Sequence, residues 1–156
     1  MKITIIAVGK LKEKFWVEAC AEYLKRLKPY ARVEVKEIAD RDPGKSGGVE
    51  AAKEQEGATI LTALSDTQQV VLLAIEGKQH SSESFSRQLD SLGLQGKSDV
   101  AFIIGGSDGV SDAVTKRANE TLSFGQITLP HNLARVVLLE QIYRAFKISR
   151  GEPYHK

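Results

Sequence analysis

Three segments of the chain are apolar at nearly every position, and this feature restricts the fold more than any other. They are Lys2–Gly9 (KITIIAVG), Gln69–Ile75 (QVVLLAI) and Asp99–Ile104 (DVAFII). A strand with one face in water alternates apolar and polar residues, whereas a strand covered on both faces has a continuous apolar run. We therefore expect these segments to be buried strands of a parallel sheet.

Helical periodicity lies between the strands. From Glu13 to Leu27 the apolar positions fall on one face of a helix that stops before Pro29. Similar patterns predict helices at 49–64, at 82–92, from a capping Ser111 to about Thr121, and from His131 to Ser149, with further strands at 32–39 and, as a short strand or extended loop, at 122–129. The alternation predicts an α/β fold, in which a mostly parallel sheet carries helices on both faces. With 156 residues, the whole chain 1–156 is expected to be one domain.

The composition excludes several classes of protein. A single cysteine allows neither an intramolecular disulfide framework nor a multi-cysteine zinc site, and the place of Cys20 on the core face of a helix predicts an inert thiol. The formal charge of +2 is too small for a protein that binds nucleic acid through bulk charge. No apolar run reaches the roughly 18 residues of a membrane span, and lysines soon after Gly9 interrupt the apolar start too early for a signal peptide. We expect a cytoplasmic protein with no membrane partner.

One segment imitates a phosphate-binding loop. Ala39–Ser46 (ADRDPGKS) fits a relaxed P-loop pattern between a strand and a helix. A P-loop needs successive backbone N–H groups that point at phosphate, but Pro43 has no N–H, and Asp40 and Asp42 would repel the anion. We interpret this segment as a surface loop.

Glycine follows or interrupts three of the apolar strand ends. These ends are Leu73–Gly77, Ile103–Gly109 and Leu122–Pro130. Ligands of open α/β sheets bind beyond the carboxyl ends of the strands, and glycine allows a close approach to the backbone. Few fixed charges are present, so a pocket walled by these ends suits an adenine-containing ligand better than a triphosphate. Tight turns and ordinary loop packing would use the same residues.

The last helix is apolar nearly all round, apart from Glu140, Arg144 and Lys147 on one narrow face. Such a helix must bury two sides, and the second side suggests a contact in a homodimer. Arg135 falls on the apolar side. An arginine at such a position is either paired across an interface or directed at an anionic ligand.

The C-terminal tail, Arg150–Lys156, combines stacking, proton-transfer and charged groups in Tyr154, His155 and Lys156. Chain ends are usually frayed, so a mobile surface histidine is the alternative reading of His155. The other two histidines, His80 and His131, have no metal-ligand spacing, and we expect no metal; His131 is expected to cap or pack the last helix.

The sequence resembles the RlmH family of small methyltransferases, which belongs to the SPOUT (α/β-knot) superfamily. The resemblance rests on ITIIAVGK, IIGGSDGVS, SFGQITLPHNLARVVLLEQIYRAFKI and the closing RGEPYHK, and it covers essentially the whole chain. It implies a C-terminal trefoil knot, a homodimer, and S-adenosyl-L-methionine bound in the knot without a metal. The cofactor-binding residues implied by the family are Leu73, Gly105, Phe124, Gly125, Gln126, Ile127, Thr128 and Leu129.

The resemblance also implies a substrate, N3 of a pseudouridine in helix 69 of 23S rRNA within the ribosome. For this reaction we expect His155 to act as the base, since histidine titrates near neutral pH. Tyr154 is expected to stack on or hydrogen-bond the target base, and Arg135 to hold a phosphate or the developing negative charge. Two alternatives are a SPOUT methyltransferase that acts on another RNA such as tRNA, and a non-catalytic ribosome-binding protein of the same fold.

Overall fold

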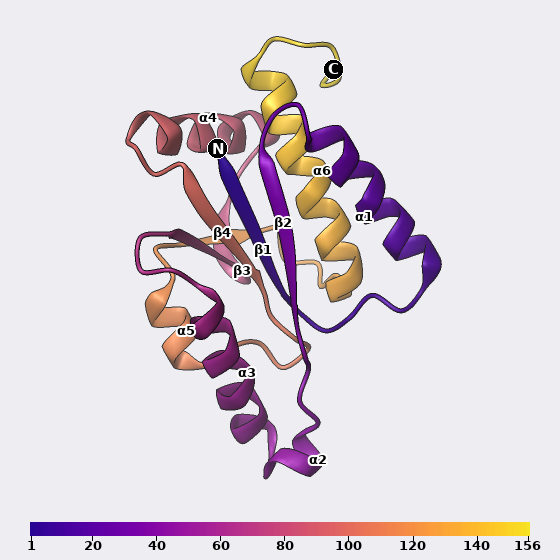
Figure 1. The fold of residues 1–156 in the computed structure, drawn as a ribbon, viewed down its shortest axis with the longest axis vertical. Coiled ribbons are helices and arrows are strands. Elements are labelled where there is room, and N and C mark those ends of the chain that lie inside the picture. The colour runs from indigo at the N-terminus through magenta and orange to yellow at the C-terminus, as the bar shows by residue number, and fades with distance from the viewer.

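A five-stranded sheet forms the centre of the computed structural model, which describes residues 1–156 (Figure 1). Its order is β2-β1-β4-β3-β5, and all four pairs of neighbours are parallel, which confirms the predicted parallel sheet. The strands are β1 (Lys2–Val8), β2 (Arg32–Ile38), β3 (Gln69–Gln79), β4 (Asp99–Ile104) and β5 (Glu120–Ser123). Parallel pairing places the carboxyl ends of the strands at one edge, where ligands of such sheets bind.

Helices cover both faces of the sheet, as predicted. The first face is covered by α1 (Lys14–Leu27), α4 (Ser82–Leu94) and α6 (His131–Ser149). The second face is covered by α3 (Val49–Ala63) and α5 (Asp112–Arg117), while the single turn α2 (Pro43–Ser46) lies outside both cores. No helix of the structure is both long enough and apolar enough to span a membrane.

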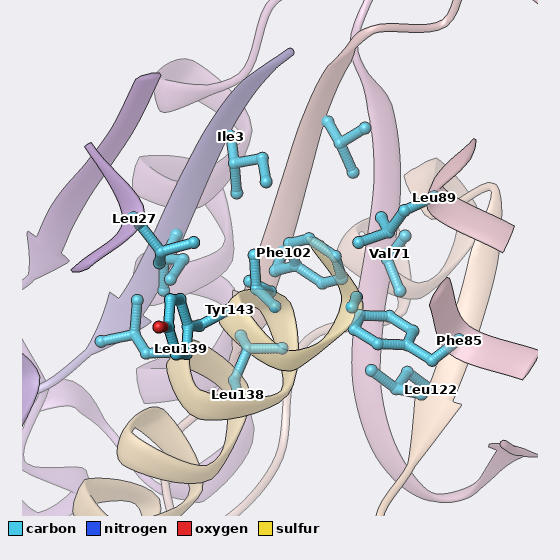
Figure 2. Close-up of a cluster of buried hydrophobic side chains, with 14 of the residues drawn as sticks. Ile3, Leu27, Val71, Phe85, Leu89, Phe102, Leu122, Leu138, Leu139 and Tyr143 are labelled. Carbon is cyan, nitrogen blue, oxygen red and sulfur yellow. The ribbon is translucent and has the colours of Figure 1, made fainter. Parts of the chain in front are cut away.

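Adjacent strand residues point into different cores, which explains the continuous apolar runs. In β4, Phe102 belongs to the core under α4 and α6, whereas Ile103 belongs to the core under α3 and α5. Figure 2 shows Phe102 beside Phe85 of α4 and above Leu138 of α6. Helices cover both faces of β4, and its residues from Val100 to Ile104 are all buried. No position in this stretch faces water, so polar residues do not alternate with apolar ones.

Two sequence predictions about the second half of the chain are wrong in detail. The helix that begins after Ser111 ends at Arg117, and residues 120–123 form β5. Asn119 explains the difference, because its N–H donates to Val70 O at 2.8 Å and its Oδ1 accepts from Val70 N at 2.8 Å. This pairing with β3 draws the chain out of the helix, and residues 124–130 then run as an irregular loop.

The segment that imitates a P-loop also differs slightly from the expected plain loop. Asp42 caps the single turn α2, and its Oδ1 accepts from the N–H of Gly44 at 2.9 Å. The aspartate therefore uses a backbone donor that a phosphate would need, and the P-loop interpretation stays excluded.

Strand β3 is longer than predicted and contains an irregularity. Both Leu73 and Lys78 pair with Leu122 of β5, so the residues between them bulge out of the ladder. The hydroxyl of Ser123 donates to Ile75 O at 2.6 Å and holds the bulge against β5. This bulge projects from the carboxyl edge of the sheet and forms one wall of the cavity described next.

Candidate functional site

An open cavity of about 1070 Å³ lies at the carboxyl edge of the sheet. Its walls come from the bulge of β3, the loop after β4 and the loop between β5 and α6. The sequence predicted that the three glycine-containing strand ends would share a pocket, and the structure confirms that they do.

Seven of the eight residues expected to bind a cofactor line this cavity. Gln126 is the exception, because its side chain is not part of the wall. The lining residues from that set are Leu73, Gly105, Phe124, Gly125, Ile127, Thr128 and Leu129. Their common position is shown, whereas their binding of a cofactor remains a prediction.

Glycine is required at two positions of the wall for different reasons. A Cβ on Gly77 would lie 2.9 Å from the carbonyl carbon of Leu122 and 3.0 Å from Ala74 O, so only glycine lets the bulge approach β5. Gly125 has a φ of 105°, a left-handed conformation that side-chain-bearing residues rarely adopt. The backbone itself therefore forms much of the cavity surface.

The charge of the cavity fits an adenosine that carries a positive sulfur rather than a phosphate. No lysine or arginine lines it, so no side chain would neutralise a phosphate. Glu76 is its one carboxylate, and His131 is its one other titratable group. Carboxylate and carbonyl oxygens favour a cation such as a sulfonium, and the apolar wall suits a purine ring.

Sequence reasoning missed the roles of Val110 and His131 in the wall, and it named Glu76 only as part of the strand end Leu73–Gly77. His131 does not cap α6; its ring packs against Gly9, with Nε2 3.4 Å from where a Cβ on that glycine would lie. The position of His131 at the first turn of a helix that starts at the carboxyl edge was the available signal, because helix starts in α/β sheets lie beside the ligand site.

Arg135 is paired within its own chain, an arrangement that the sequence interpretations did not include. Its side chain is buried, with 2% of the residue exposed, and Nη1 donates to Oε2 of Glu37 at 2.7 Å. Nη2 donates to Gly9 O at 3.1 Å, and Leu11 N donates to the same Glu37 oxygen at 3.0 Å. The Nε of Arg135 has no partner, but the buried guanidinium could reach an RNA phosphate only if the residues that cover it moved.

The electrostatics of this pair follow from its partial burial. Burial disfavours the charged carboxylate of Glu37, but the hydrogen bonds from Arg135 and Leu11 outweigh it, so the pKa of Glu37 is lowered. The pair connects the end of β2, the loop after β1 and the start of α6. We infer that it holds these three segments together beside the cavity.

The C-terminal tail is docked on the end of α6 rather than frayed. Tyr154 packs edge-on against Tyr143 and under the guanidinium of Arg144, and its hydroxyl donates to Glu140 Oε1 at 3.1 Å. Burial first, and then the neighbouring Tyr23 hydroxyl, raises the pKa of Tyr154 to about 12. The phenol therefore keeps its proton at neutral pH and acts as a donor.

His155 lies between a carboxylate and a guanidinium. Its Nε2 is 2.8 Å from Glu83 Oε1, and its Nδ1 is 3.1 Å from Arg144 Nη1. Arginine can only donate, so Nδ1 accepts and the proton of the neutral ring is assigned to Nε2, which donates to Glu83. The lone pair of His155 is thus held by Arg144 in this arrangement.

Glu83 stands out electrostatically in this tail cluster. Its own backbone N–H, then His155, and then the hydroxyl of Ser81 stabilise the carboxylate and lower the pKa of Glu83 to about 2. Glu83 lies in the first turn of α4, where the positive end of the helix dipole also favours a negative charge.

The structure does not bring the tail to the cavity of the same chain. Neither Tyr154 nor His155 lines the cavity. The tail follows the end of α6, while His131 at the start of that helix lines the cavity, and a helix of 19 residues is about 28 Å long. Figure 1 shows the C-terminus at the opposite end of α6 from the loop that leads into it.

Comparisons with known proteins identify relatives along the full length of the chain. A family model described as "Predicted SPOUT methyltransferase" matches residues 1–155. Proteins named "Ribosomal RNA large subunit methyltransferase H" from Bacillus cytotoxicus, Bacillus thuringiensis and Bacillus anthracis are each 58% identical over 159 residues, which cover 100% of both chains.

Among solved structures, a methylase family protein from Neisseria gonorrhoeae has a similar fold. The superposition has a TM-score of 0.52 at 13% identity and covers 90% of this chain and 81% of the other. At this identity the likeness concerns the fold alone.

Proposed function

Because this chain belongs to the SPOUT methyltransferase family, we propose that it transfers a methyl group from S-adenosyl-L-methionine to large-subunit ribosomal RNA. The relatives at 58% identity carry the corresponding name over their whole length. The finer proposal, which rests on the resemblance described above, is that the acceptor is N3 of a pseudouridine in helix 69 of 23S rRNA, within the assembled ribosome.

One observation carries the cofactor part of the proposal. The cavity at the carboxyl edge has walls of glycine and apolar residues, one carboxylate and no cationic side chain. Leu73, Gly105 and the Phe124–Leu129 loop would hold the adenosine, and Glu76 would face the positively charged part. The cofactor supplies an electrophilic methyl group, so the protein has to align the acceptor and exclude water.

The chemistry assigned to the protein is removal of the N3 proton and orientation of the base. His155 is the proposed acceptor of this proton through Nδ1, the ring nitrogen that carries the lone pair. For this step Nδ1 must exchange Arg144 for the substrate N–H, while Nε2–H keeps its bond to Glu83. Tyr154 stays protonated and can donate to an oxygen of the base or stack on it. The role proposed for Arg135, contact with a phosphate or the developing charge, requires that the buried guanidinium become accessible.

We further propose a homodimer in which the tail of one subunit completes the cavity of the other. The separation of the tail and the cavity along α6 supports this arrangement. Two exposed apolar side chains at the cavity mouth, Ile75 and Ile127, also support it because an apolar rim in water favours a covering surface. A face of α6 with half-buried Leu133, Val137 and Ile148 is available for the subunit contact.

The experiment that tests the reaction is mass spectrometry of rRNA after incubation with isotope-labelled methyl donor. Isolated 23S RNA, 50S subunits and 70S ribosomes are compared, with tRNA as a further substrate. Label on one pseudouridine of 23S rRNA supports the proposal, and label on tRNA alone would replace it. Absence of cofactor binding at millimolar concentration in calorimetry would favour a non-catalytic ribosome-binding protein.

The composite site is tested by mixing two impaired variants, at a concentration of methyl donor too low to fill the weakened cavity of the second. His155→Ala lacks the tail base, and Gly77→Ala lacks a correctly formed cavity. Random exchange of subunits gives heterodimers with one intact composite site, so about a quarter of the wild-type rate returns if the tail acts on the partner's cavity. If the tail acts within its own chain, no mixed dimer contains an intact site and the rate stays at the level of the variants.

A further inference from the structure

A second cavity, of about 700 Å³, lies between the end of β3, α4 and the start of β5. Eleven of its twelve lining residues are polar or charged, and Leu92 is the one hydrophobic residue. This lining contrasts with the apolar cavity described above, so the two cavities suit ligands of different chemistry.

Three cationic side chains of the second cavity have no carboxylate partner. Lys78, Arg87 and Lys97 line it, and none of them is within 4.0 Å of an acidic oxygen. We call this site, defined by these three residues, the cationic cavity. All three residues are exposed, so water screens their mutual repulsion and their charged groups are accessible to an anion.

The one carboxylate of the cationic cavity is already occupied by neutral groups. Glu120 accepts from the side-chain amide of Gln69 at 3.0 Å and from that of Gln88. It makes no ion pair with the lysines or the arginine, and these three cations outnumber its single negative charge. His80 also lines the cavity; burial first, and then the charge of Lys78, lowers the pKa of its imidazole, so the ring is neutral at pH 7 and adds a hydrogen-bonding group rather than a charge.

The functional groups of this cavity are those that recognise phosphate oxygens. Lysine and arginine bind phosphate through charge-assisted hydrogen bonds, and the hydroxyl and amide groups of Ser84, Ser91 and Gln95 supply further neutral donors. The full chain carries a charge of only +2, so this concentration of unpaired cations is a local feature.

The cationic cavity lies next to the first cavity. Thr121 of β5 lines both, and β3 passes from one to the other between Gly77 and Lys78. A strand of RNA whose target base reaches the first cavity can therefore continue into the second without leaving the surface.

We propose that the cationic cavity binds backbone phosphates of the RNA strand that flanks the methylated nucleotide. This inference rests on the proposed function for the identity of the RNA. Phosphate contacts fix the register of a nucleic acid without reading its bases. The cavity would thus place the target base over the methyl donor, although the protein as a whole is nearly neutral.

The test compares two variants that lose the same charge. Lys78→Gln/Arg87→Gln/Lys97→Gln removes the cations of the cationic cavity, and Arg41→Gln/Lys45→Gln/Lys116→Gln removes three unpaired cations near α2 and α5. Binding to 70S ribosomes that lack the modification is measured without methyl donor between 50 and 200 mM KCl at fixed magnesium. Each lost phosphate contact reduces the slope of log K against log salt by about 0.7–0.9.

We expect the cationic-cavity variant to lose about 10–100-fold in ribosome affinity at low salt and to have a slope smaller by about 2. Its affinity for S-adenosyl-L-methionine and its sedimentation should match the wild type, whereas KM for ribosomes rises. The control variant should keep the wild-type slope. Separate single variants, Lys78→Gln and Arg87→Gln, give the same direction if the triple variant does not fold.

Four results would overturn the inference. The first is an equal loss of ribosome affinity in both triple variants, and the second is an unchanged affinity of the cationic-cavity variant for ribosomes. The third is a changed sedimentation of the cationic-cavity variant, which would indicate a subunit contact. The fourth is an unchanged salt slope together with binding of inorganic phosphate by the wild type alone, which would indicate a site for small anions. Failure of the proposed function is distinguishable, because ribosomes incubated with the wild-type protein and methyl donor would then remain unmethylated. That result does not depend on the salt slopes of the two triple variants.

Discussion

The buried pair of Arg135 and Glu37 gives the sharpest prediction about how this structure is held together. Glu37→Gln keeps the shape of the side chain and one oxygen acceptor, but it removes the negative charge beside the buried guanidinium. Arg135 would then have only neutral acceptors, the new amide oxygen and Gly9 O, and its Nε already has no partner. A buried cation without a counterion raises the free energy of the folded state, so this variant should be destabilised.

The magnitude follows from the burial of the two groups. Removing one partner of a fully buried pair costs about 3–5 kcal/mol. Here the Glu37 side chain is 36% exposed, so water can partly replace it, and we expect about 2–3 kcal/mol. Arg135→Met removes the buried charge itself and lets Glu37 hydrate, so about 1–2 kcal/mol is expected, with the double variant no worse than the more affected single one.

Urea unfolding at pH 7 measures these differences, at one protein concentration because a dimer's stability depends on it. A loss of about 2–3 kcal/mol in a chain of this length should lower Tm by about 4–12 °C. The reasoning is refuted if Glu37→Gln unfolds within about 0.5 kcal/mol of the wild type. If Arg135→Met then abolishes methyl transfer at unchanged stability and cofactor affinity, Arg135 contacts the substrate as the sequence suggested.

Three other parts of the structure give predictions. Gly77→Ala places a Cβ against the backbone of β5 and should cost about 1–3 kcal/mol in unfolding and at least about tenfold in cofactor affinity by calorimetry. Gly93→Ala, where a Cβ would meet only Met1 Cε at the ordinary contact distance of 3.8 Å, should be neutral or stabilising, and equal effects of the two changes would contradict the close approach at Gly77. Because the pKa of Glu83 is lowered, its carboxylate contributes fully to tail docking above its ordinary pKa, and this contribution is lost as pH falls toward about 2. Glu83→Gln at pH 7 should therefore speed the removal of the last residues by carboxypeptidase. An unchanged rate would show that the carboxylate does not hold the tail. Burial raises the pKa of Cys20, so its reaction with a disulfide reagent at pH 8 should be at least about 100-fold slower than in the unfolded chain, and fast labelling of the native protein would contradict its place in the core.

The sequence predicted best those elements whose ends are set by residues next to them in the chain. The helix His131–Ser149 and the strand Asp99–Ile104 have the predicted bounds, because Pro130 and Gly151 enclose the one and Gly105 follows the other. The α5–β5 region was mispredicted because Asn119 bonds to Val70, a partner 49 residues away that no local pattern indicates.

In the candidate site, too, features set by nearby residues were predicted and features set by distant partners were not. Glycines at strand ends indicated the cavity, since the carboxyl ends of parallel strands necessarily meet at one edge. The partner of Arg135 was not predictable, because Glu37 belongs to a different strand and reads as an ordinary polar residue of an edge strand. The cationic cavity was also missed, since Lys78 lies on β3, Arg87 on α4 and Lys97 in the loop after α4, with no shared periodicity.

The pairing of β1 with β4 has a consequence for how the protein is made. Lys2 pairs with Asp99 and Ala7 with Ile104, so the first strand to leave the ribosome waits for almost two-thirds of the chain before its inner neighbour exists. At roughly 5–20 residues per second, this wait is about 5–20 s. During that time KITIIAV, with β2 as its only available strand neighbour, keeps one apolar edge exposed. Synthesis speed between residues 40 and 100 should therefore influence the yield of folded protein more than speed elsewhere.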